Sequence, residues 1–170
     1  LGALAPVAYG ARGTELSMMD DQALLGASQA KIDTTLERMT ALGADRLRVS
    51  AYWADIAPRP HAQKRPAGFD PRNANDPQYR WGLLDRVVGS AAAHGLRVLL
   101  SLSTPAPYWG SGRPELRNSV WAPRKTEFAA FAYAAAARYG ATVDQFAVLN
   151  EPNQGACLQP QSRHVRAVSL

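Results

Sequence analysis

The chain has 170 residues, 46% of them hydrophobic and 19% charged, which is enough for one ordinary domain with a core and excludes a disordered chain. Its formal net charge is +5, but the 19 Lys and Arg residues are scattered among 14 acidic residues. Without a block of about five like charges, this charge predicts a solvated surface, so no nucleic acid is expected as a partner. No stretch reaches the roughly 18 apolar residues that span a membrane, so no membrane partner is expected either.

The sequence offers no set of metal ligands and no nucleotide-binding motif. Cys157 is the single cysteine, so an intrachain disulfide and a cysteine-based metal site are both excluded. The three histidines, His61, His94 and His164, do not have the spacing of metal ligands. The glycine-rich phosphate-binding motifs GxGxxG and GxxxxGKS/T are absent as well. We therefore expect neither a metal nor a cofactor.

Residues 1–14 are expected to form a segment outside the domain. Residues 1–11 are apolar and small, as at the end of a signal peptide, although the positively charged start of such a signal is missing. A signal remnant predicts a secreted or extracellular protein. If the segment is a linker or an arbitrary boundary, a cytoplasmic protein is the alternative.

Along the rest of the chain, an amphipathic helix, a glycine and a short β-rich strand follow one another three times. Apolar residues at helical spacing, for example Ile32, Leu36 and Met39, define each helix, and the glycine is the expected C-terminal stop. A shorter strand is expected earlier, near residues 15–19. The expected helices cover residues 28–42, 81–94 and 126–139, the glycines are Gly43, Gly95 and Gly140, and the strands cover residues 46–50, 97–102 and 143–149.

Helices that alternate with buried strands predict βα units around a parallel sheet. The strand centres lie near residues 48, 98 and 148, so the repeat is about 50 residues long, against roughly 30 for a minimal unit. The additional residues, 51–79 and 103–123, follow strands. In (β/α) barrels the loops after the strands build the active site, so the extra length lies on the expected functional side.

Four strands in this rhythm make half of an eight-stranded barrel, which usually takes about 250 residues. We therefore predict an α/β fold, a parallel (β/α)8 TIM barrel, of which residues 15–170 supply the first four βα units. Residues 162–170 are expected to begin the next helix, and the chain is expected to be truncated. A complete, small, doubly wound α/β domain is the alternative.

The tetrapeptide NEPN at residues 150–153 follows an apolar run at residues 146–149. Such a run predicts a strand covered on both faces, as in a parallel sheet, and the proline ends it. A carboxylate at the C-terminal end of a buried parallel strand is where (β/α) barrels keep catalytic groups. An ordinary polar turn is the other interpretation of Glu151, because Asn, Pro and Glu are common where strands end.

In the order and spacing of its motifs, the chain resembles the N-terminal half of a clan A glycoside hydrolase. The enzymes of this clan are retaining (β/α)8 hydrolases, and they include the cellulase-like families five and thirty-nine. The resemblance covers residues 15–170. It rests on RLRVSAYW at residues 46–53, GLRVLL at 95–100, PAPYW at 105–109, RYG at 138–140 and LNEPN at 149–153.

The resemblance implies hydrolysis of O-glycosidic bonds in a polysaccharide or glycoside, with a carbohydrate as the partner. Glu151 matches the general acid/base, and Asn150 matches the residue that holds the sugar 2-hydroxyl. Arg48 matches the arginine that orients the nucleophilic carboxylate and keeps it ionised. In retaining enzymes the two carboxyl groups stand about 5 to 5.5 Å apart, and the acid protonates the leaving oxygen before it deprotonates water.

Other side chains are expected to bind the substrate or to pack. An arginine in a buried strand needs an acidic partner, which also singles out Arg48. Trp53 and Trp109 follow strands, and an exposed indole gives sugar rings a flat apolar platform, although such residues also pin loops to the core. Asn153, close to Glu151 in the sequence, is predicted to contact the substrate too.

Two departures from the family pattern matter. Several clan A families carry a histidine near the end of the third strand, where this chain has Ser101, Ser103 and Thr104, so the substrate subclass stays open. The family nucleophile belongs to the seventh strand, so it is expected in a C-terminal half-barrel, and the chain alone is expected to be inactive. A non-catalytic module, which binds glycans or assembles with another half-barrel, is the alternative. Unrelated barrel enzymes such as aldolases are disfavoured, because they need a lysine in a strand.

Overall fold

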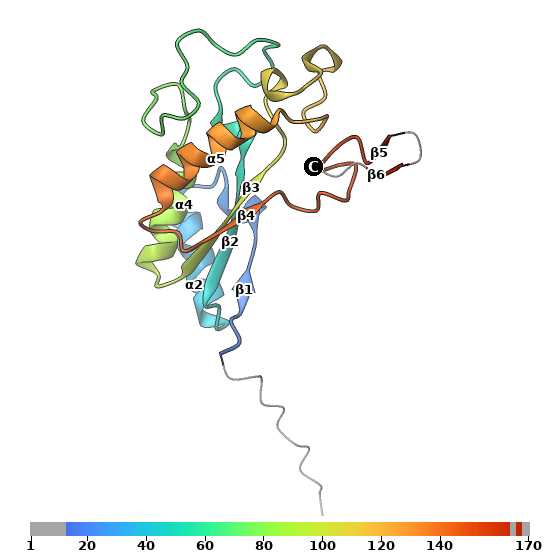
Figure 1. The fold of residues 1–170 in the computed structure, drawn as a ribbon. Helices are drawn as coiled ribbons and strands as arrows, with labels where there is room; N and C mark the ends of the chain where they lie inside the picture. The colour runs from blue at the N-terminus through green and yellow to red at the C-terminus, as the bar shows by residue number, and fades with distance from the viewer. Residues whose placement is uncertain (1–12, 164–165, 168–170) are drawn as a thin grey trace, which may run out of the picture.

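The computed structural model describes residues 13–163 and 166–167. Four parallel strands form one sheet in the order β1, β2, β3, β4, and helices connect consecutive strands (Figure 1). The strands are β1 (Ser17–Met18), β2 (Arg46–Tyr52), β3 (Arg97–Ser103) and β4 (Gln145–Val148). The helices are α1 (Asp21–Leu24), α2 (Gln29–Ala41), α3 (Trp53–Ile56), α4 (Gly82–Ala93) and α5 (Lys125–Tyr139), with two 3-10 turns, η1 (Tyr108–Gly110) and η2 (Pro114–Leu116).

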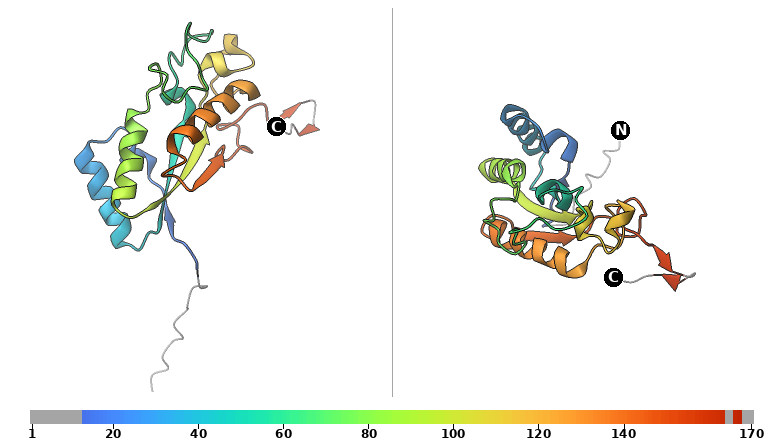
Figure 2. Two further views of the ribbon diagram at one scale, coloured as in Figure 1. Left: turned by 60° about the vertical axis from the view of Figure 1, so that its left-hand side comes forward. Right: turned by 90° about the horizontal axis from the view of Figure 1, so that it is seen from above.

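The strand order follows the chain order without a reversal, and α2, α4 and α5 lie on one side of the sheet (Figure 2). A doubly wound domain reverses its strand order and carries helices on both faces, so that alternative is wrong. The chain folds as four consecutive parallel strands with a helical connection between each pair, which is part of a (β/α)8 barrel as the sequence predicted; among the described residues no helix follows β4. Among the described residues β1 and β4 each have one neighbouring strand, so both edges of this half-barrel sheet are open.

The helix-facing side of the sheet forms the core. The register pairs Leu47 with Val98 and Val49 with Leu100, so these four side chains share one face of the two central strands. All four are at most 1% exposed, and they belong to one cluster with apolar residues of α2, α4 and α5. Because side chains alternate along a strand, Arg48 lies on the opposite face, which lines the interior of a barrel.

Glycine ends the helices for two different physical reasons. Gly43 and Gly95, after α2 and α4, have φ angles of +86° and +75°, which side chains rarely allow. Gly140, after α5, has a φ angle of −61°. A Cβ atom at this position would lie 2.7 Å from the carbonyl oxygen of Ala136, so glycine is required there for space.

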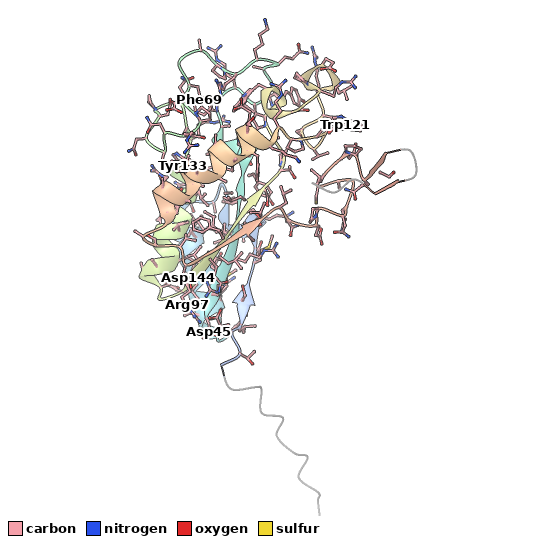
Figure 3. The ribbon with its side chains drawn as sticks, viewed as in Figure 1. Asp45, Phe69, Arg97, Trp121, Tyr133 and Asp144 are labelled. Atoms are coloured by element: carbon pink, nitrogen blue, oxygen red, sulfur yellow. The ribbon has the colours of Figure 1, made fainter. Side chains whose placement is uncertain are left out.

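At the N-terminal end of the sheet, Arg46 joins Glu15, two residues before β1, to Asp144, the residue before β4. Its Nε donates to Glu15 Oε2 at 2.8 Å, and its Nη2 donates to Asp144 Oδ2 at 2.9 Å. These hydrogen bonds hold the pKa of both carboxyls below the usual range. Figure 3 shows Asp144 and Arg97 at the end of the sheet opposite the long loops. This end of a barrel serves stability, so Arg46 has a structural role.

Two local predictions are wrong. The strand at residues 143–149 is shorter than predicted and is not covered on both faces, because β4 is an edge strand among the described residues: Phe146 is 37% exposed and Val148 is 65% exposed. An apolar hollow of about 210 Å³ lies beside Val148. Residues 162–170 do not begin a helix where they are described, since β5 (Ser162–Arg163) pairs antiparallel with β6 (Arg166–Ala167). So short a segment, below about 12 residues, rarely forms a helix without tertiary support.

Every helix in residues 13–163 and 166–167 falls short of the length and apolar character that crossing a membrane requires. The predicted N-terminal segment, residues 1–14, lies outside the described residues except for its last two positions.

Candidate active site

The loops that follow β2 and β3 gather at the C-terminal end of the sheet, at the top of Figure 1. Hydrogen bonds join the two loops, for example from Ala54 N to Pro105 O at 2.8 Å and from Tyr108 N to Pro60 O at 2.7 Å. The loops therefore form one continuous structure around the strand ends. The long loops thus lie at the end of the sheet that carries the active site in parallel barrels.

Arg48 and Asn150 meet at this end, although 102 positions separate them in the sequence. Arg48 lies in the middle of β2, because the strand extends to Tyr52, beyond its predicted end. Its long side chain reaches the end of β4, where Nη2 donates a hydrogen bond to Asn150 Oδ1 at 2.5 Å. Both side chains are half-buried. The fold thus joins two of the residues that the sequence predicted to share a site.

The guanidinium of Arg48 is only partly paired. Its Nε is buried and has no hydrogen-bond partner, and no carboxylate among the described residues forms an ion pair with it. A buried, unpaired N–H group costs free energy, more so when it belongs to a cation. The acidic partner that the sequence predicts for Arg48 is therefore not supplied by the described residues. A carboxylate placed beside Nε would satisfy this donor.

The backbone turns sharply at the end of β4 and leaves Glu151 exposed. Leu149 N still bonds to Leu102 O at 2.8 Å, so the strand pairing continues up to the turn. Leu149 and Glu151 then have φ angles of +59° and +44°, in the left-handed region that residues other than glycine seldom occupy. Strained residues of this kind gather at functional sites. The side chains of Glu151 and Asn153 are exposed and make no hydrogen bond to a described residue, so both are open to a ligand.

Asp21 and Tyr52 form a second polar pair at the strand ends, which the sequence analysis missed. Asp21 accepts hydrogen bonds from Ser50 N at 3.1 Å and from the Tyr52 hydroxyl at 3.0 Å. Burial raises the pKa of Tyr52, and the neighbouring Asp21 carboxylate raises it further, so the hydroxyl stays protonated at neutral pH. The one sequence signal for Tyr52 is that it lies an even number of positions after Arg48, which places both side chains on the same face of a strand. This signal was not used, because the strand was predicted to end at Ser50.

Trp53 and Trp109 do not form a sugar platform in this structure. Trp53 is 0% exposed and stacks on Phe131, with ring centroids 5.9 Å apart, while Trp109 is 1% exposed and meets Trp53 edge to face. The Trp109 Nε1 donates to Pro58 O at 3.0 Å, inside the loop structure. Since neither indole offers an exposed face, the predicted sugar-binding role is wrong for both, and they pin their loops to the core.

Small hydroxyl side chains line the end of β3, where the resemblance to clan A enzymes implied a histidine in several families. Ser101 and Ser103 are buried, and their Oγ atoms lie 3.2 Å apart. Thr104 donates to the carbonyl oxygen of Cys157 at 2.5 Å, so the loop after β3 contacts the segment that follows Glu151. The loops after β3 and β4 are therefore held together beside the candidate site.

No family model matches the sequence, and no curated protein matches it. Solved structures do match. A psychrophilic β-glucosidase from Micrococcus antarcticus is 20% identical over 78% of this chain, with a TM-score of 0.52, and the match covers 27% of that protein. An endo-1,4-β-mannanase from Rhizomucor miehei is 13% identical over 89% of this chain, with a TM-score of 0.51, and the match covers 49% of that protein. The chain thus spans between about a quarter and a half of these proteins, and it shares the fold of part of each of them, in agreement with the predicted half of a (β/α)8 barrel.

Proposed function

We propose that the chain is one half of a retaining glycoside hydrolase and that it contributes the general acid/base and part of the sugar-binding site. The observation that carries this proposal is the hydrogen bond between Arg48 and Asn150, directly beside the exposed Glu151. Arg48 reaches from β2 to Asn150, and Asn150 and Glu151 both follow β4 at the end of the sheet where barrel enzymes act. They are the residues that match the acid, the 2-hydroxyl ligand and the arginine beside the nucleophile in the related enzymes.

The arrangement gives each of the three residues a chemical role. Glu151 donates its proton to the glycosidic oxygen as the bond breaks, and it later removes a proton from the water that attacks the glycosyl-enzyme intermediate. The Arg48 guanidinium has only donors, so the atom of Asn150 that faces it is the amide oxygen. This contact leaves Asn150 Nδ2 as a donor to a sugar hydroxyl. Arg48 therefore orients the Asn150 amide, and its Nε can donate to a carboxylate.

The nucleophile in this proposal comes from a second half-barrel. Two other glutamates at this end of the molecule are engaged in ion pairs: Glu115 pairs with Arg113, and Glu127, in the first turn of α5, pairs with Arg65. The second half-barrel pairs with the open edges of β1 and β4 and brings a carboxylate to Nε of Arg48. For retention that carboxylate stands about 5 to 5.5 Å from Glu151. The chain without it is inactive.

A purely glycan-binding module has less support than an enzyme. That alternative depended on exposed tryptophans, and Trp53 and Trp109 are buried in the core. The open sheet edges remain compatible with assembly, which the proposed enzyme also requires. Assembly therefore belongs to the proposal and does not compete with it.

The proposal is tested with the complete barrel, meaning this chain together with its second half. The matching structures suggest β-glucosides and β-1,4-mannan as the first substrates. The anomeric configuration of the first product, followed by proton NMR, is expected to be that of the substrate. An inverted product would contradict the retaining mechanism, and the absence of hydrolysis across neutral and acidic β-linked glycans would contradict the enzyme.

A further inference from the structure

Two segments at the loop end of the molecule together carry a charge equal to that of the whole chain. We define the basic rim as residues 58–65 and 108–127. It contains seven Lys or Arg residues and two Glu residues, a formal net charge of +5. Because the entire chain also has a net charge of +5, the remaining residues sum to zero. The 19 cations look scattered along the sequence, but the fold collects seven of them in this rim.

Hydrogen bonds and an ion pair hold the two segments of the basic rim together. Tyr108 N donates to Pro60 O at 2.7 Å, and Arg124 N donates to Gly110 O at 2.7 Å. The side chain of Arg65 pairs with Glu127 at 3.2 Å. The segment at residues 58–65 therefore lies against η1 and the start of α5, and the rim is one surface, at the top of Figure 1.

Most of the cations in the basic rim have no anionic partner in the protein. Arg65 pairs with Glu127, and Arg113 pairs with Glu115. The other five are exposed and form no ion pair with a described residue. They are Arg59, Lys64, Arg117, Arg124 and Lys125. Uncompensated charges of one sign repel each other and attract anions, so this surface fits a negatively charged partner.

The basic rim borders the candidate site. Gln159 N donates to Val120 O at 2.8 Å, and Ala122 N donates to Gln159 O at 2.6 Å. These bonds attach the rim to the segment that follows Glu151. The rim therefore contacts the loop whose first residues include the proposed acid/base.

We propose that the basic rim binds an anionic glycan, one that carries carboxylate or sulfate groups, and leads it to the site at Glu151. This inference names the substrate class of the proposed glycosidase and rests on that proposal for its chemistry, but the binding itself is measured without hydrolysis. A nucleic-acid partner has less support, because single-stranded nucleic acids stack their bases on exposed aromatic rings, and the rim buries Trp109 and half-buries Trp121.

The test measures binding of this chain to four fluorescently labelled polymers: polygalacturonate, heparin, neutral galactomannan and duplex DNA. The rim variant is Arg124→Glu with Lys125→Glu, at the start of α5, where glutamate is compatible with the helix because its charge opposes the helix dipole. The control is Lys31→Glu with Arg38→Glu on α2, which makes the same change in net charge on an exposed helix outside the rim.

The chain is expected to bind polygalacturonate or heparin and to bind galactomannan at least about tenfold more weakly, with affinity that falls as salt is added. The rim variant should weaken binding by about tenfold, and the control by no more than about twofold. Equal affinity for galactomannan, or equal losses in the two variants, would overturn the proposal. Tighter binding to DNA than to both anionic glycans would overturn it as well. If the chain binds anionic glycans but the complete barrel hydrolyses no glycan, the proposed function is wrong and the proposed binding by the rim is confirmed. If the complete barrel hydrolyses neutral glycans and the rim binds no anionic glycan, the proposed function is kept and the proposed binding by the rim is wrong.

Discussion

Asn150 Oδ1 accepts a hydrogen bond from Arg48 Nη2 at 2.5 Å, and this contact ties the middle of β2 to the end of β4. It orients the Asn150 amide, and it leaves Nε of Arg48 buried without a partner. A side chain that is well placed but not satisfied contributes little to the stability of the folded chain. Such residues are typical of sites where function and stability oppose each other.

Replacing Arg48 by Met is expected to leave the chain as stable as before or to raise its free energy of unfolding by about 1 kcal/mol. The reason is that the change removes a buried, unpaired donor while keeping most of the side-chain volume. Urea unfolding of the chain measures this free energy. In the complete barrel the same change should lower kcat/KM at least about 100-fold, because the nucleophile loses its charged partner.

Arg46→Met is the matched control for this prediction. Arg46 is buried and pairs with Glu15 and Asp144, so its loss should lower the free energy of unfolding. An Arg48→Met variant that is destabilised as much as Arg46→Met would show that Arg48 is a structural residue.

The packing of Trp53 can be tested at Gly110, which lies against the indole. A Cβ atom at Gly110 would come within 2.5 Å of Trp53 Cη2. Gly110→Ala is therefore expected to lower the free energy of unfolding by about 1–3 kcal/mol through overpacking. Gly89→Ala, on an exposed position of α4 with nothing within 4 Å of the new Cβ, should instead raise it by about 0.5–1 kcal/mol. A neutral Gly110→Ala would mean that Trp53 is free to move and to meet a ligand.

The ion pairs of Arg46 predict how stability changes at acid pH. Hydrogen bonds from Arg46 lower the pKa of Asp144 and of Glu15 in the folded chain. A carboxyl whose pKa is lower in the folded state than in the unfolded state binds fewer protons when folded. Its stabilising effect is therefore present above the unfolded-state pKa, about 4, and is lost as the pH falls through the lower folded-state value.

Asp144→Asn should accordingly be less stable than the original chain at pH 7, and its stability should fall less steeply below about pH 4. Urea unfolding at a series of pH values compares the two chains. Parallel pH profiles would show that the Arg46 contacts do not contribute to the acid dependence.

The fold was predictable from the sequence because its signals are local and repeated. Helical spacing such as Ile32, Leu36 and Met39, followed by Gly43 at a positive φ angle, marks a βα unit wherever it occurs. Arg48 and Asn150 were also predictable, since each is a polar residue at an apolar strand. The direct contact between Arg48 and Asn150 was not predictable, because it depends on the offset between β2 and β4, which a complete βα unit separates.

The loops were the part that sequence could not predict. No periodicity in residues 51–79 or 103–123 shows which tryptophans face inward, and Trp53 and Trp109 pack in the core because the two loops fold against each other and against α5. The same folding brings together cations that are up to 66 positions apart, from Arg59 to Lys125, and so creates the basic rim. Tyr52 was missed because β2 is two residues longer than the pattern indicated.

The most direct test introduces Glu151→Ala into the complete barrel. It then compares the hydrolysis of two substrates that share a sugar and differ in the leaving group. Glu151 is exposed and makes no side-chain hydrogen bond to a described residue, so the change should not disturb the fold. Exposed Glu37 on α2, outside the basic rim, is the control when replaced by Ala. The rate with an alkyl or sugar leaving group should fall about 10²- to 10⁴-fold, since that group needs a proton.

With an activated aryl leaving group, the first step of Glu151→Ala should be preserved, and added azide should speed the second step because it attacks without a general base. Glu37→Ala should behave like the original protein on both substrates. Equal loss on both substrates with no response to azide would contradict the assignment of Glu151 as the acid/base.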